Sequence, residues 1–313
     1  MIYAILKPLI RIALFFFFRK IFIQHQTVLN TKGPLLITAN HPNSFLDAII
    51  IGALFKHPVH FLARGDAFKK RYHRFLLRLL NMIPIYRLSE GKQYLHLNDY
   101  AFKASQKVLN NQGIVLIFIE GICVRSHQLQ PLKKGAARIA LEYQGKQPLQ
   151  VLPLGIAYSH LEGWSKSVQL IPSTPILAET LFTQQDRAKN MLLFNQALQP
   201  KLEALIIQPP IAKESIQSIE ANLLKMLNIF GLIGWVLHYP FIKPIQRWVK
   251  SKTANTVFYD SVLFGTYFFA YPIVCCLIAI ILNQFLESIF VWLILMLFIF
   301  LGRCIVYYKN PAE

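Results

Sequence analysis

His41 and Asp47 are the side chains near the start of the chain whose types and spacing could support proton transfer. They belong to the segment TANHPNSFLDAII, residues 38–50, in which five residues separate them. A histidine can act as a general base near neutral pH when a carboxylate fixes its tautomer and stabilises the imidazolium. The pair therefore predicts general-base catalysis.

The same segment also matches a purely structural pattern. Ser44 followed three residues later by Asp47 is a capping box, with Ser44 as the N-cap of a new helix. In that case Asp47 stabilises a helix start, and His41 belongs to an ordinary strand-to-helix junction. These residues alone leave both interpretations open.

Cationic side chains follow other segments that a parallel sheet would bring to the same edge. Sites in open α/β sheets form beyond the carboxyl ends of the strands, and His41 lies just past the end of PLLITA. Several arginines and lysines at that edge could hold a phosphate. The candidates are Arg87, Arg125, Lys133 and Lys134.

The elements that would position these residues lie between residues 24 and 225. Short β-rich runs (PLLITA, VHFLA, GIVLIFIE and LQVLPLGIAY) alternate there with helical stretches. This alternation predicts an α/β domain with a mostly parallel sheet flanked by helices.

The N-terminal 23 residues are expected to form a membrane-associated helix. Their longest uncharged run, residues 12–18, is too short to cross about 30 Å of hydrocarbon, which takes about 20 residues. A helix lying in the membrane interface fits better. The apolar part is not followed by a small-residue cleavage site, so we do not expect a secretory signal.

Residues 226–313 are expected to form a membrane region. The uncharged run 228–241 is too short to span, which favours a re-entrant or interfacial segment. Ser261–Leu282 and Phe285–Tyr308 predict a transmembrane hairpin, with a buried helical pair in a soluble core as the alternative. Because cations flank the hairpin and its turn has none, both ends should be cytoplasmic.

The charge of the chain favours an anionic partner. Its 33 Lys and Arg against 15 Asp and Glu give a formal charge of +18, while 54% of the residues are hydrophobic. Long uncharged runs do not suit a soluble nucleic-acid binder, so we expect anionic membrane lipids and no nucleic acid.

The segment from Arg64 to Arg87 carries seven of these cations and one acid, interleaved with apolar residues. This pattern is typical of a basic amphipathic helix that meets anionic lipid or an acidic acyl carrier. The alternative is a helix whose apolar side packs on the sheet.

The cysteines and histidines lack the paired spacing of a metal site. Cys123, Cys275, Cys276 and Cys304 are taken as reduced thiols, and His57 and His60 flank a proline at a strand entry. We expect neither a metal nor another cofactor.

Four sequence blocks in order carry a family resemblance. NHPNSFLD, IPIYR, FIEG with LKKGA, and VLPLG together resemble the glycerolipid acyltransferase superfamily, which includes lysophosphatidic acid and glycerol-3-phosphate acyltransferases. The resemblance covers residues 30–160. It implies that His41 deprotonates the acceptor hydroxyl, which attacks an acyl thioester, and that Asp47 orients His41. For Arg87, Glu120 and Gly121 it implies acceptor-phosphate binding or support of the site.

Departures from the usual pattern in three blocks bear on the acceptor, and in the second block Asn81 and Pro84 stand where the superfamily has glycine and phenylalanine. The superfamily usually has four residues between the histidine and the aspartate, whereas this chain has five, as some glycerol-3-phosphate acyltransferases do. The extra residue must bulge before the helix, and Pro42-Asn43 suits a turn. In addition, Ile122-Cys123-Val124 separates Gly121 from Arg125, where one residue is common.

The resemblance implies a membrane-bound O-acyltransferase of phospholipid synthesis, with its catalytic domain on the cytoplasmic face of the cell membrane. Its donor would be acyl-CoA or acyl carrier protein, and its acceptor a glycerophosphate or a lysolipid. Two alternatives stay open. One is a non-catalytic membrane protein that binds lipid, and the other is an acyltransferase for an aminoacyl lysolipid.

Overall fold

The computed structural model describes residues 2–87, 90–206 and 218–308 of the chain. The chain divides into two compact units. The first unit comprises Met1–Leu9, Phe22–Ala157 and Gln169–Pro209. The second unit comprises Ile10–Ile21, Tyr158–Val168 and Pro210–Glu313.

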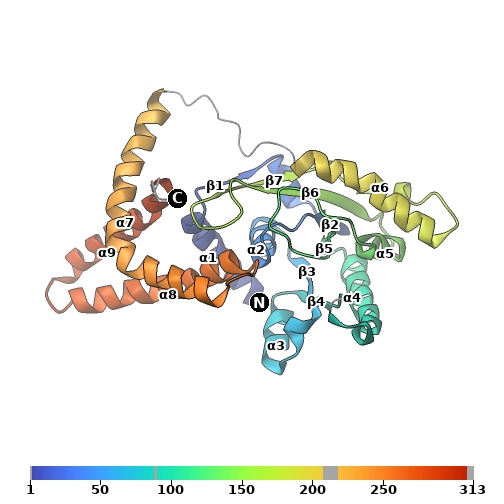
Figure 1. Cartoon of the computed structure of the whole chain (residues 1–313), viewed down its shortest axis with the longest axis horizontal. Coiled ribbons are helices and arrows are strands. Elements are labelled where there is room, and N and C mark those ends of the chain that lie inside the picture. The colour runs from blue at the N-terminus through green and yellow to red at the C-terminus, as the bar shows by residue number, and fades with distance from the viewer. Residues whose placement is uncertain (1, 88–89, 207–217, 309–313) are drawn as a thin grey trace. The chain divides into compact units, whose positions relative to one another are not determined.

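A mixed sheet organises the α/β part of the chain (Figure 1). Its strands are β1 (Lys20–Ile23), β2 (Leu35–Ala39), β3 (Val59–Arg64), β4 (Met82–Ile85), β5 (Ile114–Phe118), β6 (Gln150–Tyr158), β7 (Ser167–Pro172) and β8 (Ile176–Leu177). Their order is β1-β7-β6-β2-β5-β3-β4, and β8 pairs with β6 in antiparallel orientation.

The central strands run parallel. β2 lies between β5 and β6, with Ala39 opposite both Phe118 and Leu154, and β3 pairs with β4 and β5. Every residue of β2 is buried, as expected for a strand covered on both faces. The predicted α/β fold with a mostly parallel sheet is confirmed, and the carboxyl ends of β2, β4 and β5 share one edge.

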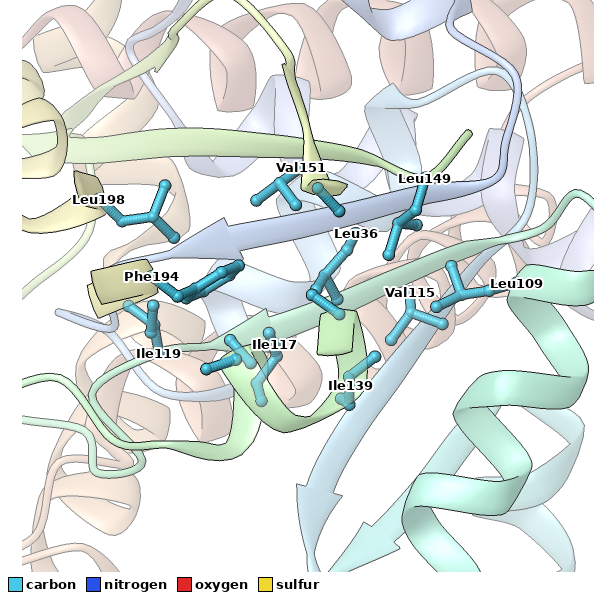
Figure 2. Close-up of a cluster of buried hydrophobic side chains, with 14 of the residues drawn as sticks. Leu36, Leu109, Val115, Ile117, Ile119, Ile139, Leu149, Val151, Phe194 and Leu198 are labelled. Carbon is cyan, nitrogen blue, oxygen red and sulfur yellow. The ribbon is translucent and has the colours of Figure 1, made fainter. Parts of the chain in front are cut away.

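The helices of the first unit are α2 (Phe45–Leu54), α3 (Arg71–Leu79), α4 (Asn98–Asn110), α5 (Gly135–Leu141) and α6 (Arg187–Ile206). Figure 2 shows part of the core, where Leu36, Val115 and Ile117 of the sheet meet Phe194 and Leu198 of α6. Side chains of α4 and α5 join the same cluster. This packing fixes the strands whose ends carry the candidate site.

The segment 64–87 forms a shorter helix than its composition predicts. Arg64 ends β3, the stretch Met82–Ile85 is β4, and only Arg71–Leu79 is α-helical. The apolar run of β4 continues the helical pattern in the sequence, so charge and hydropathy did not separate the two elements. No residue of α3 is fully buried. Leu77 and Leu79 are half-buried, whereas Tyr72, Phe75 and Leu76 are exposed, so most of the apolar side of α3 does not pack on the sheet.

The N-terminal helix α1 spans Ile2–Phe17, and Lys20–Ile23 forms β1 instead of continuing it to residue 23. Ile2, Ile5, Leu9 and Ile12 are exposed and, being three or four residues apart, form one stripe along the helix. Such a stripe is compatible with the expected position in a membrane interface.

The second unit contains three further helices. They are α7 (Ser218–Lys252), α8 (Tyr259–Leu282) and α9 (Ser288–Cys304). Residues 228–241 are the middle of α7, one continuous helix, and the expected re-entrant or interfacial placement of this segment stays a prediction. Helix α8 and the helical stretch Ser288–Tyr307, which begins with α9, are each long and apolar enough to cross a membrane.

The apolar stretch of α8 is not buried within the described structure. Phe269, Ile273 and Leu277 are exposed along it, and Trp292 and Met296 are exposed on α9. A helical pair in a soluble core would bury such residues. The exposure is compatible with the expected hairpin, and 39% of the apolar window in the second stretch is buried.

A buried ion pair joins two parts of the second unit. The Lys166 ammonium binds the Asp260 carboxylate at the start of α8, and both side chains are inaccessible to solvent. Asp260 also accepts a hydrogen bond from the Gly163 N–H (2.8 Å), and Lys166 lies over the Tyr158 ring. These contacts give the buried charges the partners they need.

Candidate active site

His41 and Asp47 lie where β2 gives way to α2. The His41 Nδ1 is 2.9 Å from the Asp47 Oδ2, and the aspartate side chain is fully buried while that of His41 is 18% exposed. The imidazole stacks on Phe118 at the end of β5, with ring centroids 3.7 Å apart. Because Nδ1 faces the carboxylate, Nε2 is the ring nitrogen that can take a proton from a substrate.

The capping interpretation of this segment is correct in part. Ser44 is the N-cap of α2, but its side chain makes no capping hydrogen bond. Instead Asp47 Oδ2 accepts a hydrogen bond from the Asn43 N–H (2.7 Å) as well as facing His41. One carboxylate oxygen therefore serves both the helix start and the histidine.

Glu120 holds the backbone beside the pair. One of its carboxylate oxygens accepts a hydrogen bond from the His41 N–H (3.0 Å), and the other accepts one from the Gln130 N–H (2.9 Å). Burial raises the pKa of Glu120, and the two N–H donors oppose this rise. Since both oxygens bind backbone groups, the geometry matches support of the site better than phosphate binding.

Arg87 follows β4 and is brought to Gly121. Its Nη1 donates to the Gly121 carbonyl (3.3 Å), and its Nε donates to Glu90 (3.0 Å). Glu90, whose side chain is 8% exposed, also accepts a hydrogen bond from the Asp66 N–H (3.2 Å). The sequence analysis missed Glu90; its position three residues after Arg87 was the available signal.

Gly121 requires glycine for two reasons. Its φ is +67°, and a Cβ there would come within 2.9 Å of the Lys133 side chain. Lys133 is itself fixed by a hydrogen bond from its N–H to the Ile119 carbonyl (2.8 Å). The structure thus brings Lys133 to Gly121, whereas the phosphate-binding roles of Lys133, Lys134 and Arg125 stay predictions.

Asn40 is a second residue that the sequence analysis did not single out, although it precedes His41 in the first block. Its amide donates to the Ile156 carbonyl (2.9 Å) and accepts a hydrogen bond from the Ile156 N–H (2.7 Å). This pair ties the end of β2 to β6. It fixes the point at which the chain leaves the sheet toward His41.

Across residues 2–87, 90–206 and 218–308, no group of three or more histidine, cysteine, aspartate or glutamate side chains is arranged to hold a metal ion. The chemistry that the arrangement offers is proton transfer at Nε2 of His41, supported by a buried carboxylate.

Comparison with known proteins relates the segment that carries this site to a family. Residues 20–157 match the family described as Acyltransferase, and no curated protein sequence matches the chain. Among solved structures, the 1-acyl-sn-glycerophosphate (LPA) acyltransferase PlsC from Thermotoga maritima is similar, with 18% identity and a TM-score of 0.42 over 60% of this chain and 73% of that one. The family match includes His41, Asp47, Arg87 and Glu120. Residues 20–157 of the chain therefore match the Acyltransferase family, in agreement with the resemblance that the sequence blocks carry.

Proposed function

We propose that this protein moves a fatty acyl group from a carrier thioester to a hydroxyl of a glycerophosphate or lysolipid acceptor in phospholipid synthesis. The observation that carries the proposal is the buried Asp47 carboxylate 2.9 Å from the His41 Nδ1, within the stretch that matches the acyltransferase family. A protein that only binds lipid would have no use for a base oriented in this way.

In this mechanism His41 Nε2 takes the proton of the acceptor hydroxyl as its oxygen attacks the thioester carbon. The new carbon–oxygen bond forms, the carbon–sulfur bond breaks, and the imidazolium returns the proton to the departing thiolate. Asp47 stabilises the imidazolium and holds the tautomer that leaves Nε2 able to accept the proton.

The acceptor phosphate would be bound by cations near the site. Glu90 and the Gly121 carbonyl hold the Arg87 side chain in one orientation, which suits a residue that grips a phosphate by directed hydrogen bonds. Lys133, Lys134 and Arg125 are the further candidates.

The partners follow from this reaction. The donor would be acyl-CoA or acyl carrier protein, and anionic lipids would surround the acceptor at the membrane. An aminoacyl lysolipid is the alternative acceptor. We further propose that α8 and α9 cross the cell membrane as a hairpin and that the catalytic domain is cytoplasmic.

The first prediction concerns His41. Purified protein should release thiol from acyl-CoA or acyl carrier protein only when an acceptor is present, and His41→Ala should lower that rate by roughly 10²–10⁴-fold because the base is lost. His96→Ala, at an exposed histidine outside the site, is the matched control and should retain the wild-type rate.

The acceptor panel should contain glycerol-3-phosphate, its monoacyl form, an aminoacyl lysolipid and a monoacylglycerol that lacks phosphate. Preference for a phosphorylated acceptor over the monoacylglycerol would support the proposal that the cationic residues bind the acceptor phosphate. A wild-type rate in His41→Ala would show that His41 is not the base. Absence of acceptor-dependent thiol release by the wild-type protein would favour the lipid-binding alternative.

The second prediction separates the two roles of Asp47. Asp47→Asn keeps an oxygen that can accept the Asn43 N–H, so the melting temperature should change little. Its amide cannot stabilise an imidazolium and can donate to Nδ1, which favours the wrong tautomer, so turnover should fall by roughly 10²–10⁴-fold. Rate and melting temperature are measured on one preparation. A proportional loss of both would mean that Asp47 serves only the helix start.

The third prediction concerns the hairpin. Single cysteines replacing Lys252 and Asn283, in a variant whose four native cysteines are serine, are exposed to a membrane-impermeant maleimide in intact cells. Only position 283, in the turn, should react before lysis. Labelling at 252 before lysis would contradict the cytoplasmic placement, and a turn that reacts only after lysis would contradict a full crossing.

A further inference from the structure

Helix α3 presents an apolar stripe to solvent. Tyr72, Phe75 and Leu76 are 59%, 64% and 53% exposed, and Leu79 continues the same face at helical spacing. Large apolar side chains gathered in this way on a short helix usually mark a surface that meets another molecule.

Basic side chains surround this stripe. Five exposed cations lie on or next to the helix, namely Lys69, Lys70, Arg71, Arg74 and Arg78. Arg71, Arg74 and Arg78 recur at intervals of three and four residues, so they form a row beside the apolar one. Apolar and cationic rows side by side complement the acyl chains and phosphates of a membrane interface.

We infer that α3 docks the first unit on the anionic face of a lipid bilayer. Tyr72, Phe75 and Leu76 insert among the acyl chains, and the cations of α3 bind lipid phosphates. An acidic acyl carrier would satisfy the charges, but it offers less reason for exposing three large apolar side chains in a row. The docking surface is independent of the acyl-transfer chemistry.

The test uses full-length protein in lipid nanodiscs, with an environment-sensitive fluorophore on a cysteine that replaces Phe75 and the native cysteines changed to serine. Phosphatidylglycerol in the disc should shift the emission to the blue and allow quenching by spin-labelled lipid, whereas phosphatidylcholine alone should not. The same probe at Lys107, an exposed position on α4, is the control and should not respond.

Replacing Lys70, Arg71 and Arg78 by glutamate should abolish the lipid response of the probe at 75. Equal emission in both kinds of disc would overturn the inference. A response to added acyl carrier protein but not to phosphatidylglycerol would also overturn it, in favour of a carrier-docking surface. Because the readout does not require turnover, the His41→Ala protein serves equally well.

A second inference comes from the loop that carries the extra residue between His41 and Asp47. Ser44 has a φ of +52°, a region that residues other than glycine seldom adopt. Its N–H donates to the Cys123 Sγ at 3.0 Å. Cys123 belongs to Ile122-Cys123-Val124, which is the second place where this chain is longer than its superfamily usually is.

Two more contacts join the same segments. The Val124 N–H donates to the His41 carbonyl (3.3 Å), and Glu120 accepts from the His41 N–H (3.0 Å). Residues 120–124 therefore hold both the His41 backbone and Ser44, the N-cap residue of α2. The two lengthened loops, after β2 and after β5, therefore contact each other. The Cys123 thiol is the acceptor for the buried Ser44 N–H.

We propose that Cys123 is a positioning residue, which fixes the unusual Ser44 backbone so that the first turn of α2 brings Asp47 to His41. Burial raises the pKa of Cys123 to about 12, with the Asp47 charge adding to the effect, so the side chain is a neutral thiol. A neutral thiol can accept the Ser44 N–H but is a poor nucleophile. The catalytic part of this proposal rests on the proposed acyl transfer.

The test compares Cys123→Ala with Cys123→Ser. Alanine removes the acceptor, and displacement of the pair should lower kcat by roughly 10–100-fold with little change in KM for the acyl donor. Serine keeps an oxygen acceptor and should recover most of the rate. Cys276→Ala, at an exposed thiol on α8, should behave like wild type.

Hydrogen–deuterium exchange of peptides covering residues 41–50 gives a readout that does not depend on turnover. Exchange should be faster in Cys123→Ala than in Cys123→Ser. Unchanged exchange and kcat in the alanine variant would overturn the proposal, as would an acyl thioester trapped on Cys123. If exchange responds as expected but the wild type transfers no acyl group, the proposed function fails and the loop contact stands.

Discussion

The rest of the site depends on the contact between His41 and the buried Asp47 carboxylate. An ionised carboxylate removed from water requires strong hydrogen-bond partners, and Asp47 has the Asn43 N–H and the His41 ring. Both partners lie on the four residues between the end of β2 and the N-cap of α2. The conformation of this short connection is therefore constrained at once by the strand, by the helix start and by the charge.

The parallel sheet supplies the second half of the arrangement. Ala39 of β2 lies opposite Phe118 of β5, so the chain leaves both strands at the same level. Phe118 then lies under the His41 ring, and Glu120 reaches the His41 backbone. Because β4 is parallel to β3 and β3 to β5, the loop after β4 reaches this edge too, which explains how Arg87 contacts Gly121.

The sequence predicted the parts of this arrangement that have a local signature. The α/β alternation, the His41 and Asp47 pair and the placement of Arg87 at the edge of the sheet that carries the site follow from strand periodicity and from residues at strand ends. Contacts between distant loops have no such signature, which is why Glu90, Asn40 and the Ser44–Cys123 hydrogen bond were found only in three dimensions. The true length of α3 was missed because Met82–Ile85 extends the apolar pattern although proline and the pairing with β3 make it a strand.

The same distinction explains why catalysis is easier to infer than the acceptor. The proton-transfer pair needs two residue types in a fixed relation, and the family match, the burial and the distance all point to one chemistry. The proposed binding of the acceptor would depend on the loops after β4 and β5, and this chain differs from the usual superfamily pattern in both the first and the third block. Cys123 joins those two departures, because its sulfur accepts the Ser44 N–H. The loop contact therefore links the start of α2 and the His41 backbone to the loop after β5, for which a role in acceptor binding is proposed.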